Sequence, residues 1–275
     1  MTEQTVELRD VRGPSALGGG WRRTLELLYI IAVNEFKRSY FGTALGYLWS
    51  IARPLLLFGV LLAVFTRLVR FTSVPHYTVL LLLNIVLFGF FQEATGQATA
   101  SVLNQEGVVR KTQFPRLVIP LAVVLTSMFN LALNLLVAFA FILGFGVAPR
   151  WTWLLLVFVL LALFVYTTAI AMILSSLFPR FRDVGIIWAV LLTALFYATP
   201  VIYPLQRVHG TIGKLLGANP LAPLLELARR WVIDPRAPVT GGVLHVVVPA
   251  VIYVAVCGLA VWIFNREAPK IAESL

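Results

Sequence analysis

Few side chains in this sequence have the type and spacing that catalysis requires, and the first candidate is a glycine–lysine pair. Gly213-Lys214 is the only such pair, but Leu215 follows it and Val208 stands where a phosphate-binding loop has its first glycine. That loop cradles phosphate with backbone N–H groups and needs both glycines and a following Ser or Thr. We therefore expect no ATP site, no magnesium site and no other cofactor on this chain.

Metal ligation and nucleophilic catalysis are not indicated either. His76, His209 and His245 lie far apart, and none is paired with an acid at the spacing of a metal site. No G-x-S-x-G turn, which would present a catalytic serine, occurs in the sequence. An integral-membrane glycosyl- or acyltransferase would need a His/Asp or paired-acid site at the membrane surface. Because we find none, we expect a chain that is not an enzyme.

Three polar residues lie within or beside apolar stretches. Glu93 is the main acid in or beside the spans. A proton-coupled carrier usually needs several membrane acids or a histidine relay, so we expect Glu93 to make a buried or interfacial polar contact instead. Asn130 and Asn134 are four residues apart and so share one helix face. They are consistent with hydrogen bonds between helices and also with a polar strip along a permeation path.

The composition shows where such residues must be placed. Hydrophobic residues make up 60% of the 275-residue chain and charged residues only 12%, whereas soluble domains have about 25% charged residues. This balance predicts one membrane domain. The net charge of +10 is then explained by basic inner loops and anionic lipid headgroups rather than by nucleic acid.

Charge-free stretches predict an all-α integral membrane fold with six spans, since each span needs about 20 apolar residues. The first span includes Arg53, which could snorkel to the headgroups from near a helix end. The distribution of Lys and Arg places residues 1–20, residues 266–275 and both termini in the cytoplasm. The predicted spans of the domain 46–265 are 46–68, 76–97, 117–145, 152–177, 184–204 and 243–265.

The segments between the spans carry their own patterns. Residues 21–39 repeat apolar residues at helical spacing and predict an amphipathic helix, either in the inner membrane interface or packed as a soluble helix. The inner loop 99–115 is either a short docking helix or a solvated linker. The outer loop 205–242 contains a predicted helix at 223–232, after the turn signal Asn219-Pro220.

Aromatic residues gather on the predicted fifth span. Trp188, Phe196 and Tyr203 fall within about 80° of one another on a helical wheel. Such rings could line a conduit and stack on sugar faces, or they could face lipid as interfacial anchors.

Several blocks of the sequence resemble the type-2 ABC exporter permeases for polysaccharides, the membrane subunits that export O-antigen, teichoic acid and related lipid-linked glycans. The block KRSYFGTALGYLWSIARPLL (37–56) resembles the start of that family's first span, apart from Arg53, where many relatives carry an uncharged residue. The blocks NQEGVVRKTQFPRLVIPL (104–121) and ATPVIYPL (198–205), with Asn219-Pro220, follow in the family's order. The resemblance covers about residues 25–264.

The resemblance implies a homodimer that works with two separate ATPase subunits, which would bind the ATP and magnesium. Residues 21–39 would then be the interface helix, and the first and fifth spans would line a channel at the dimer interface. A coupling helix near 102–112 would seat on the ATPase, and short gating helices near 221–231 would close the outer side. The coupling residues would be Gln105, Glu106, Arg110 and Lys111, the channel aromatics Trp188, Phe196 and Tyr203, and the outer-gate residues Leu221, Leu225 and Trp231.

The expected cargo is a polyprenyl-diphosphate-linked polysaccharide carried across the cytoplasmic membrane of a bacterium. Lys37, Arg38 and Arg53 near the inner lip could hold its diphosphate, or they could bind anionic lipids. The excess of Arg over Lys favours a GC-rich genome, for which cell-wall galactan is the natural cargo. A permease for a drug or small lipid is the alternative of the same class, and a membrane scaffold would leave the gate-like outer loop unexplained.

Overall fold

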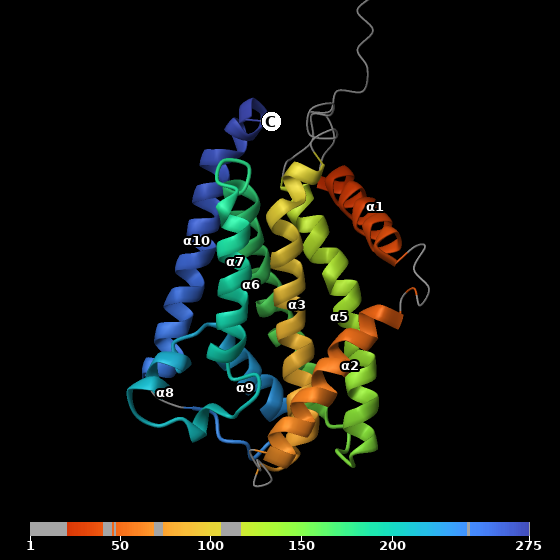
Figure 1. The fold of residues 1–275 in the computed structure, drawn as a ribbon, viewed down its shortest axis with the longest axis vertical. Coiled ribbons are helices and arrows are strands. Elements are labelled where there is room, and N and C mark those ends of the chain that lie inside the picture. Colours follow the sequence, from red (N-terminus) through yellow and green to blue (C-terminus); the bar gives the residue numbers. More distant parts are fainter. Residues whose placement is uncertain are drawn as a thin grey trace, which may run out of the picture.

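The computed structural model describes residues 21–40, 46, 48–68, 74–105, 117–240 and 243–274, and every regular element in these ranges is helical (Figure 1). Helix α2 continues into a π-helical turn, Val64–Leu68, and 3-10 turns occur at Trp151–Leu155 and Leu205–Arg207. The α-helices are α1 (Trp21–Tyr40), α2 (Leu48–Ala63), α3 (Tyr77–Asn104), α5 (Val118–Gly144), α6 (Leu156–Leu177), α7 (Asp183–Ala198), α8 (Gly210–Gly217), α9 (Leu221–Val232) and α10 (Val243–Ser274).

Among the residues that the structure describes, five helical segments are long and apolar enough to cross a membrane: Leu48–Arg67, Tyr77–Asn104, Val118–Gly144, Trp151–Leu177 and Leu244–Glu267. They agree in position with five of the six predicted spans, so the described chain is that of a multi-pass membrane protein. The other predicted span coincides with α7, which is apolar but only 16 residues long.

Helix α7 ends six residues before the end predicted for its span, so the helical extent predicted for residues 199–204 is wrong. Thr199 is extended, and Pro200 follows it. The ring of a proline disfavours the helical conformation in the residue before it, which is consistent with the stop at Thr199. The side chains of Tyr77 and Asn84 on α3 hold the turn that follows, because they donate hydrogen bonds to the carbonyls of Ile202 (2.8 Å), Pro200 (3.1 Å) and Val201 (3.1 Å).

Helix α3 is the centre of the bundle (Figure 1). In its most apolar stretch 78% of the residues are buried, compared with 11% in α2 and in α10. A helix that is apolar on all sides must be surrounded by other helices or by lipid, and α3 is surrounded by α2, α5, α6 and α7. The described residues therefore leave most of the apolar surface of helices α2 and α10 uncovered.

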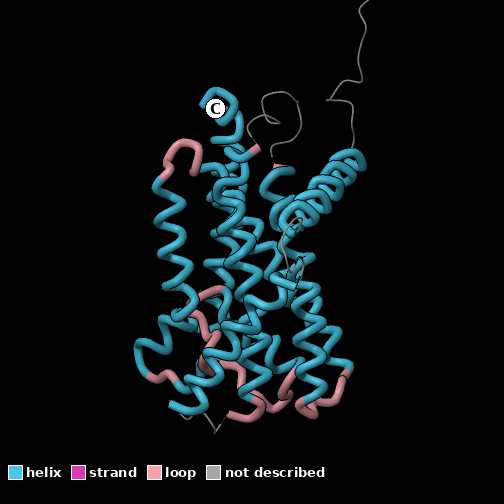
Figure 2. The backbone as a smooth tube through the Cα atoms, turned by 45° about the vertical axis from the view of Figure 1, so that its right-hand side comes forward, coloured by secondary structure: helices cyan, strands magenta, loops and turns pink. Residues whose placement is uncertain are grey.

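Helix α1 lies oblique to the bundle, at the end that also holds the C-terminus (Figure 1; Figure 2). It packs against α5: the hydroxyl of Thr126 donates to the carbonyl of the fully buried Ala32 (3.1 Å), and the rings of Phe36 and Phe129 meet edge to face. Helices α8 and α9 lie at the opposite end, which we call the outer cap after the side of the membrane predicted for it. The predicted helices at 21–39 and 223–232 are thus confirmed as helices.

Candidate functional site

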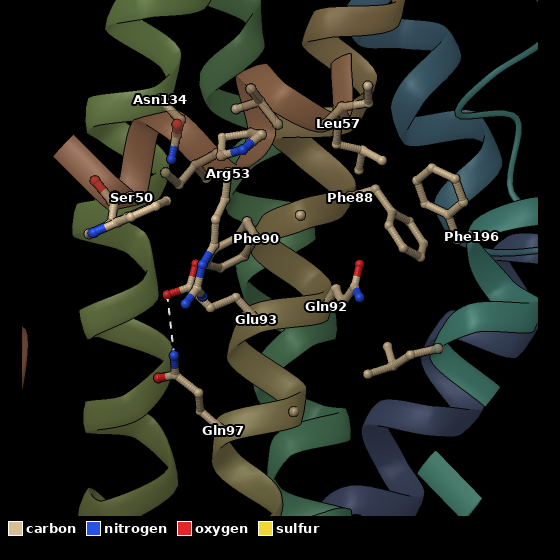
Figure 3. A pocket seen from close by; sticks show the side chains of 18 residues that line it. Ser50, Arg53, Leu57, Phe88, Phe90, Gln92, Glu93, Gln97, Asn134 and Phe196 are labelled. Carbon is tan, nitrogen blue, oxygen red and sulfur yellow. Dashed lines mark hydrogen bonds between the residues drawn. The ribbon is translucent and has the colours of Figure 1, made fainter. Parts of the chain in front are cut away.

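A pocket of about 1000 Å³ lies between α2 and α7, with α3 and α5 behind it (Figure 3). We call it the α2–α7 groove. Its walls come from segments that are far apart in the sequence. Helices α2 and α7 both pack on α3, and residues of α2, α3, α5 and α7 line the pocket. The lining residues are Trp49, Ser50, Arg53, Pro54, Leu57, Ile85, Val86, Phe88, Gly89, Phe90, Gln92, Glu93, Gly96, Gln97, Leu131, Asn134, Leu192 and Phe196.

The groove is polar and charged in the part nearer the end of the bundle that holds the C-terminus of the chain. Glu93 is fixed by two amides, since Asn130 Nδ2 (2.5 Å) and Gln97 Nε2 (3.3 Å) both donate to its Oε1. The side chain of Arg53 extends from α2 toward Glu93 (Figure 3) and interacts with it electrostatically. Opposite charges from two helices therefore face each other across the groove.

Glu93 lies well inside the length of α3, whereas Arg53 is five residues from the start of α2. Glu93 is 16 residues beyond Tyr77 and 11 before Asn104, the two ends of α3. At 1.5 Å per residue these separations are about 24 Å and about 16 Å. An arginine within a membrane helix is costly unless it faces an interior cavity or a partner, and Arg53 faces the groove.

The part of the groove nearer the outer cap is apolar and aromatic. Phe196 of α7 meets Phe88 of α3 edge to face, with 5.4 Å between the ring centroids, and Leu57 and Leu192 complete this wall. The groove thus changes along its length from carboxylate, guanidinium and amide groups to hydrocarbon and ring faces. Such a surface matches a molecule that carries both charged and apolar groups.

The three predicted channel aromatics take different positions. Phe196 lies on the groove wall. Trp188 lies against α3, where its indole Nε1 donates to the hydroxyl of Thr95 (3.1 Å) and its ring meets Phe91 edge to face. Tyr203 lies beyond α7, and its hydroxyl donates to the carbonyl of Tyr197 (2.9 Å). Helical-wheel geometry fails for Tyr203 because the helix has already ended.

The two asparagines of α5 divide between the roles left open by the sequence. Asn130 is buried and bonds Glu93 on the neighbouring helix, as expected for a contact between helices. Asn134 lines the groove and donates to the carbonyl of Asn130 (2.9 Å). The bond between Asn130 and Glu93 also confirms the expectation that Glu93 makes a polar contact.

The basic and coupling residues are only partly within the described residues. Lys37 is exposed on α1, whereas the side chain of Arg38 lies outside the described part, so the two are not brought to Arg53 by any described contact. Gln105 ends α3, and its Nε2 donates to Glu35 of α1 (3.5 Å). Glu106, Arg110 and Lys111 lie outside the described residues. No cluster of potential metal ligands occurs among the residues the structure describes.

The outer cap contains a buried carboxylate that the sequence reasoning missed. Glu226 of α9 accepts hydrogen bonds from Gln206 Nε2 (2.8 Å), from the backbone N–H of Thr240 (3.0 Å) and from the Thr240 hydroxyl (2.6 Å). It thereby joins three segments of the 205–242 loop. The available signal was a single acid on the apolar face of an amphipathic helix.

Arg229 lies one turn further along α9 and is also buried. Burial lowers its pKa, while the charges of Asp234 and Glu226 act in the opposite direction. The predicted gate residues have structural contacts here: Leu221 and Leu225 are buried, and the carbonyl of Trp231 accepts a bond from Thr152 (2.5 Å).

Comparison with known proteins agrees with this membrane architecture. The profile of the ABC-2 type transporter family matches residues 26–232. An O-antigen export system permease protein, RfbA, from Myxococcus xanthus is 28% identical over 251 residues, which cover 90% of this chain and 95% of that protein. An RfbA from Klebsiella pneumoniae is 28% identical over 256 residues, 91% of this chain and 95% of that protein. The chain belongs to the ABC-2 type transporter family, as its sequence blocks indicated.

Proposed function

We propose that this chain is the membrane permease subunit of an ATP-driven exporter of polyprenyl-diphosphate-linked polysaccharide, of the O-antigen, teichoic acid or cell-wall galactan type. The observation that carries the proposal is the similarity to O-antigen export permeases over nine-tenths of the chain. A groove with a charged part and an aromatic part supports it, because such a cargo has an anionic head and sugar faces. No observation favours the alternative of a drug or small-lipid permease.

We propose six crossings, with α7 and the turn after it as the fifth. Helix α7 alone measures about 24 Å at 1.5 Å per residue, less than the roughly 30 Å of a hydrocarbon core. Irregular backbone at membrane depth must be buried in protein rather than exposed to lipid. The turn 199–202 meets this condition, because Tyr77 and Asn84 hold it against α3. Both termini and α1 would then be cytoplasmic, and the outer cap would lie outside.

The proposed assembly is a homodimer with two ATPase subunits in the bacterial cytoplasmic membrane. Helices α2 and α7 flank the groove and expose large apolar side chains, including Leu56, Val60, Ile186 and Val190. A second copy placed against these faces would close two grooves into one conduit. The inner loop that begins at Gln105 would carry the contact with the ATPase, and α1 would lie in the membrane interface.

Energy coupling is proposed to depend on Gln105, Glu106, Arg110 and Lys111. Charge reversal at Glu106 or Arg110 should lower cargo-stimulated ATPase activity while leaving the subunits assembled. The assay is ATP hydrolysis by the co-purified complex in nanodiscs, with reversal of the exposed outer residue Arg230 as the control. Unchanged activity would remove these residues from the coupling contact.

The cargo is tested by depleting the chain in the producing cell. We expect lipid-linked polymer to accumulate at the cytoplasmic face and to disappear from the surface. Polymer and lipid carrier are measured in extracts, beside the drug sensitivity of the same cells. Unchanged polymer together with increased drug sensitivity would replace the glycan by a drug or small lipid.

A further inference from the structure

Arg53 has a positive charge on the wall of the groove and, among the described residues, no bonded counterion. Within the described ranges it forms no hydrogen bond and no ion pair, and its side chain is exposed toward the groove. Ser50, one turn earlier on the same helix, and Gln97 and Asn134 on the facing helices also line this part. The groove therefore presents a free guanidinium with amide and hydroxyl groups around it.

Glu93 is the nearby anion, but it is not bonded to Arg53. Its Oε1 is held by Asn130 of α5 and by Gln97 of its own helix. Arg53 acts on Glu93 electrostatically, and no salt bridge joins the two among the described residues. Such an arrangement leaves the donors of Arg53 available, since a planar guanidinium can bind two oxygens of one phosphate at once.

We propose that Arg53 binds a phosphate group of the cargo inside the α2–α7 groove, and that Glu93 is a built-in competitor that keeps this binding weak. This inference rests on the proposed function and assigns a role within it to Glu93. The ligand class is an isoprenoid diphosphate, whose phosphates would meet Arg53 while its hydrocarbon follows the wall formed by Leu57, Phe88 and Phe196.

A competitor is useful at this position because transport fails when binding is too tight. A conduit must bind strongly enough to admit its cargo and weakly enough to release it. The Glu93 carboxylate repels an incoming phosphate and attracts the same guanidinium, and at membrane depth these interactions are screened less than in water. Its anchoring by Asn130 prevents the carboxylate from moving out of the way.

The test is ligand binding to the full chain in nanodiscs of neutral lipid, without the ATPase, which has phosphate sites of its own. The probes are farnesyl diphosphate, inorganic diphosphate and farnesol. Glu93→Gln keeps an oxygen for Asn130 and removes the charge, and we expect it to tighten farnesyl diphosphate binding by about tenfold. Arg53→Gln should weaken it by at least about tenfold, and Arg53→Lys by about threefold.

Arg230→Gln is the matched control, because it removes a charge from an exposed residue of α9 that does not line the groove. We expect it to leave diphosphate binding unchanged, and farnesol should bind equally to all variants. Unchanged or weaker binding by Glu93→Gln would overturn the competitor role, and wild-type binding by Arg53→Gln would overturn the site. Equal affinities for inorganic and farnesyl diphosphate would assign the site to a free anion and overturn the lipid-linked ligand.

Failure of this inference can be told apart from failure of the proposed function. Export is measured in cells, whereas the binding assay needs neither ATP nor glycan. If cells export polymer but diphosphate binding to the chain does not depend on the charges of Arg53 and Glu93, the inference alone is refuted. Charge-dependent binding in a chain whose depletion leaves polymer export intact would refute the function and keep the site.

Discussion

The outer cap and the α2–α7 groove each contain one buried or half-buried glutamate, and the two are used differently. Glu226 accepts three hydrogen bonds from residues up to 20 positions away along the chain and so joins separate segments. Glu93 is held by one amide from α5 and one from its own helix, and beside it lies an open pocket whose Arg53 has no bonded partner among the described residues. A carboxylate enclosed by donors stabilises a fold, whereas one that faces a cavity is available to a ligand.

The largest effect is expected from Glu226→Ala. It leaves the N–H and hydroxyl of Thr240 and the amide of Gln206 without their acceptor, which should cost roughly 2–4 kcal/mol of stability. The readouts are thermal unfolding in detergent and trypsin cleavage at the exposed Arg236, which should become faster. Arg230→Gln on the same helix is the control and should change neither, and stability equal to wild type would contradict the joining role.

A smaller effect is expected from Asn84→Leu, which frees the carbonyls of Pro200 and Val201. We expect a loss of roughly 1–3 kcal/mol, with faster hydrogen exchange in the turn after α7. Asn134→Leu is the comparison, because the Nδ2 of Asn134 bonds only a carbonyl of its own helix. If Asn134→Leu lowered the stability as much as Asn84→Leu, the distinction between an asparagine that holds the fold and one that lines the groove would not hold.

Trp188→Phe tests whether an aromatic beside the groove belongs to it. The variant loses the hydrogen bond to Thr95 and should lower stability by about 1 kcal/mol without changing the export rate. Phe196→Leu, on the groove wall, should do the reverse and slow export at nearly unchanged stability. Export slowed by the Trp188 variant at unchanged stability would support the predicted channel role of this residue.

The smallest effect on stability is expected from Glu93→Gln. Glutamine retains an oxygen that can accept hydrogen bonds from Asn130 and Gln97. The free energy of unfolding should therefore change by less than about 0.5 kcal/mol. A loss as large as that of Glu226→Ala would identify Glu93 as a structural residue of the same kind. Unfolding is followed by intrinsic tryptophan fluorescence.

Much of this architecture could be predicted from the sequence, because a membrane imposes one simple rule on helix length and composition. The five long spans, α1 and α9 follow from apolar stretches and helical spacing. The end of α7 was missed although Pro200 marks it, because a stretch defined by the absence of charged residues can contain a proline. Chain-local patterns therefore placed the elements better than their ends.

The groove was harder to predict because its contacts join distant positions. Arg53 and Glu93 are 40 residues apart, and nothing in either segment specifies that α2 and α3 bring them face to face. The bond of Asn130 to Glu93 was one of two readings that spacing allowed, and the network of Glu226 had no sequence pattern beyond a single acid. Such pairs are defined by packing rather than by local spacing.

The most direct test of the central proposal is transport into inverted membrane vesicles that contain this chain and its ATPase partner. We expect ATP-dependent accumulation of polyprenyl-diphosphate-linked glycan, none of the same glycan without its lipid, and none when either subunit is omitted. ATP hydrolysis by this chain alone, or equal uptake of the unlinked glycan, would contradict the account.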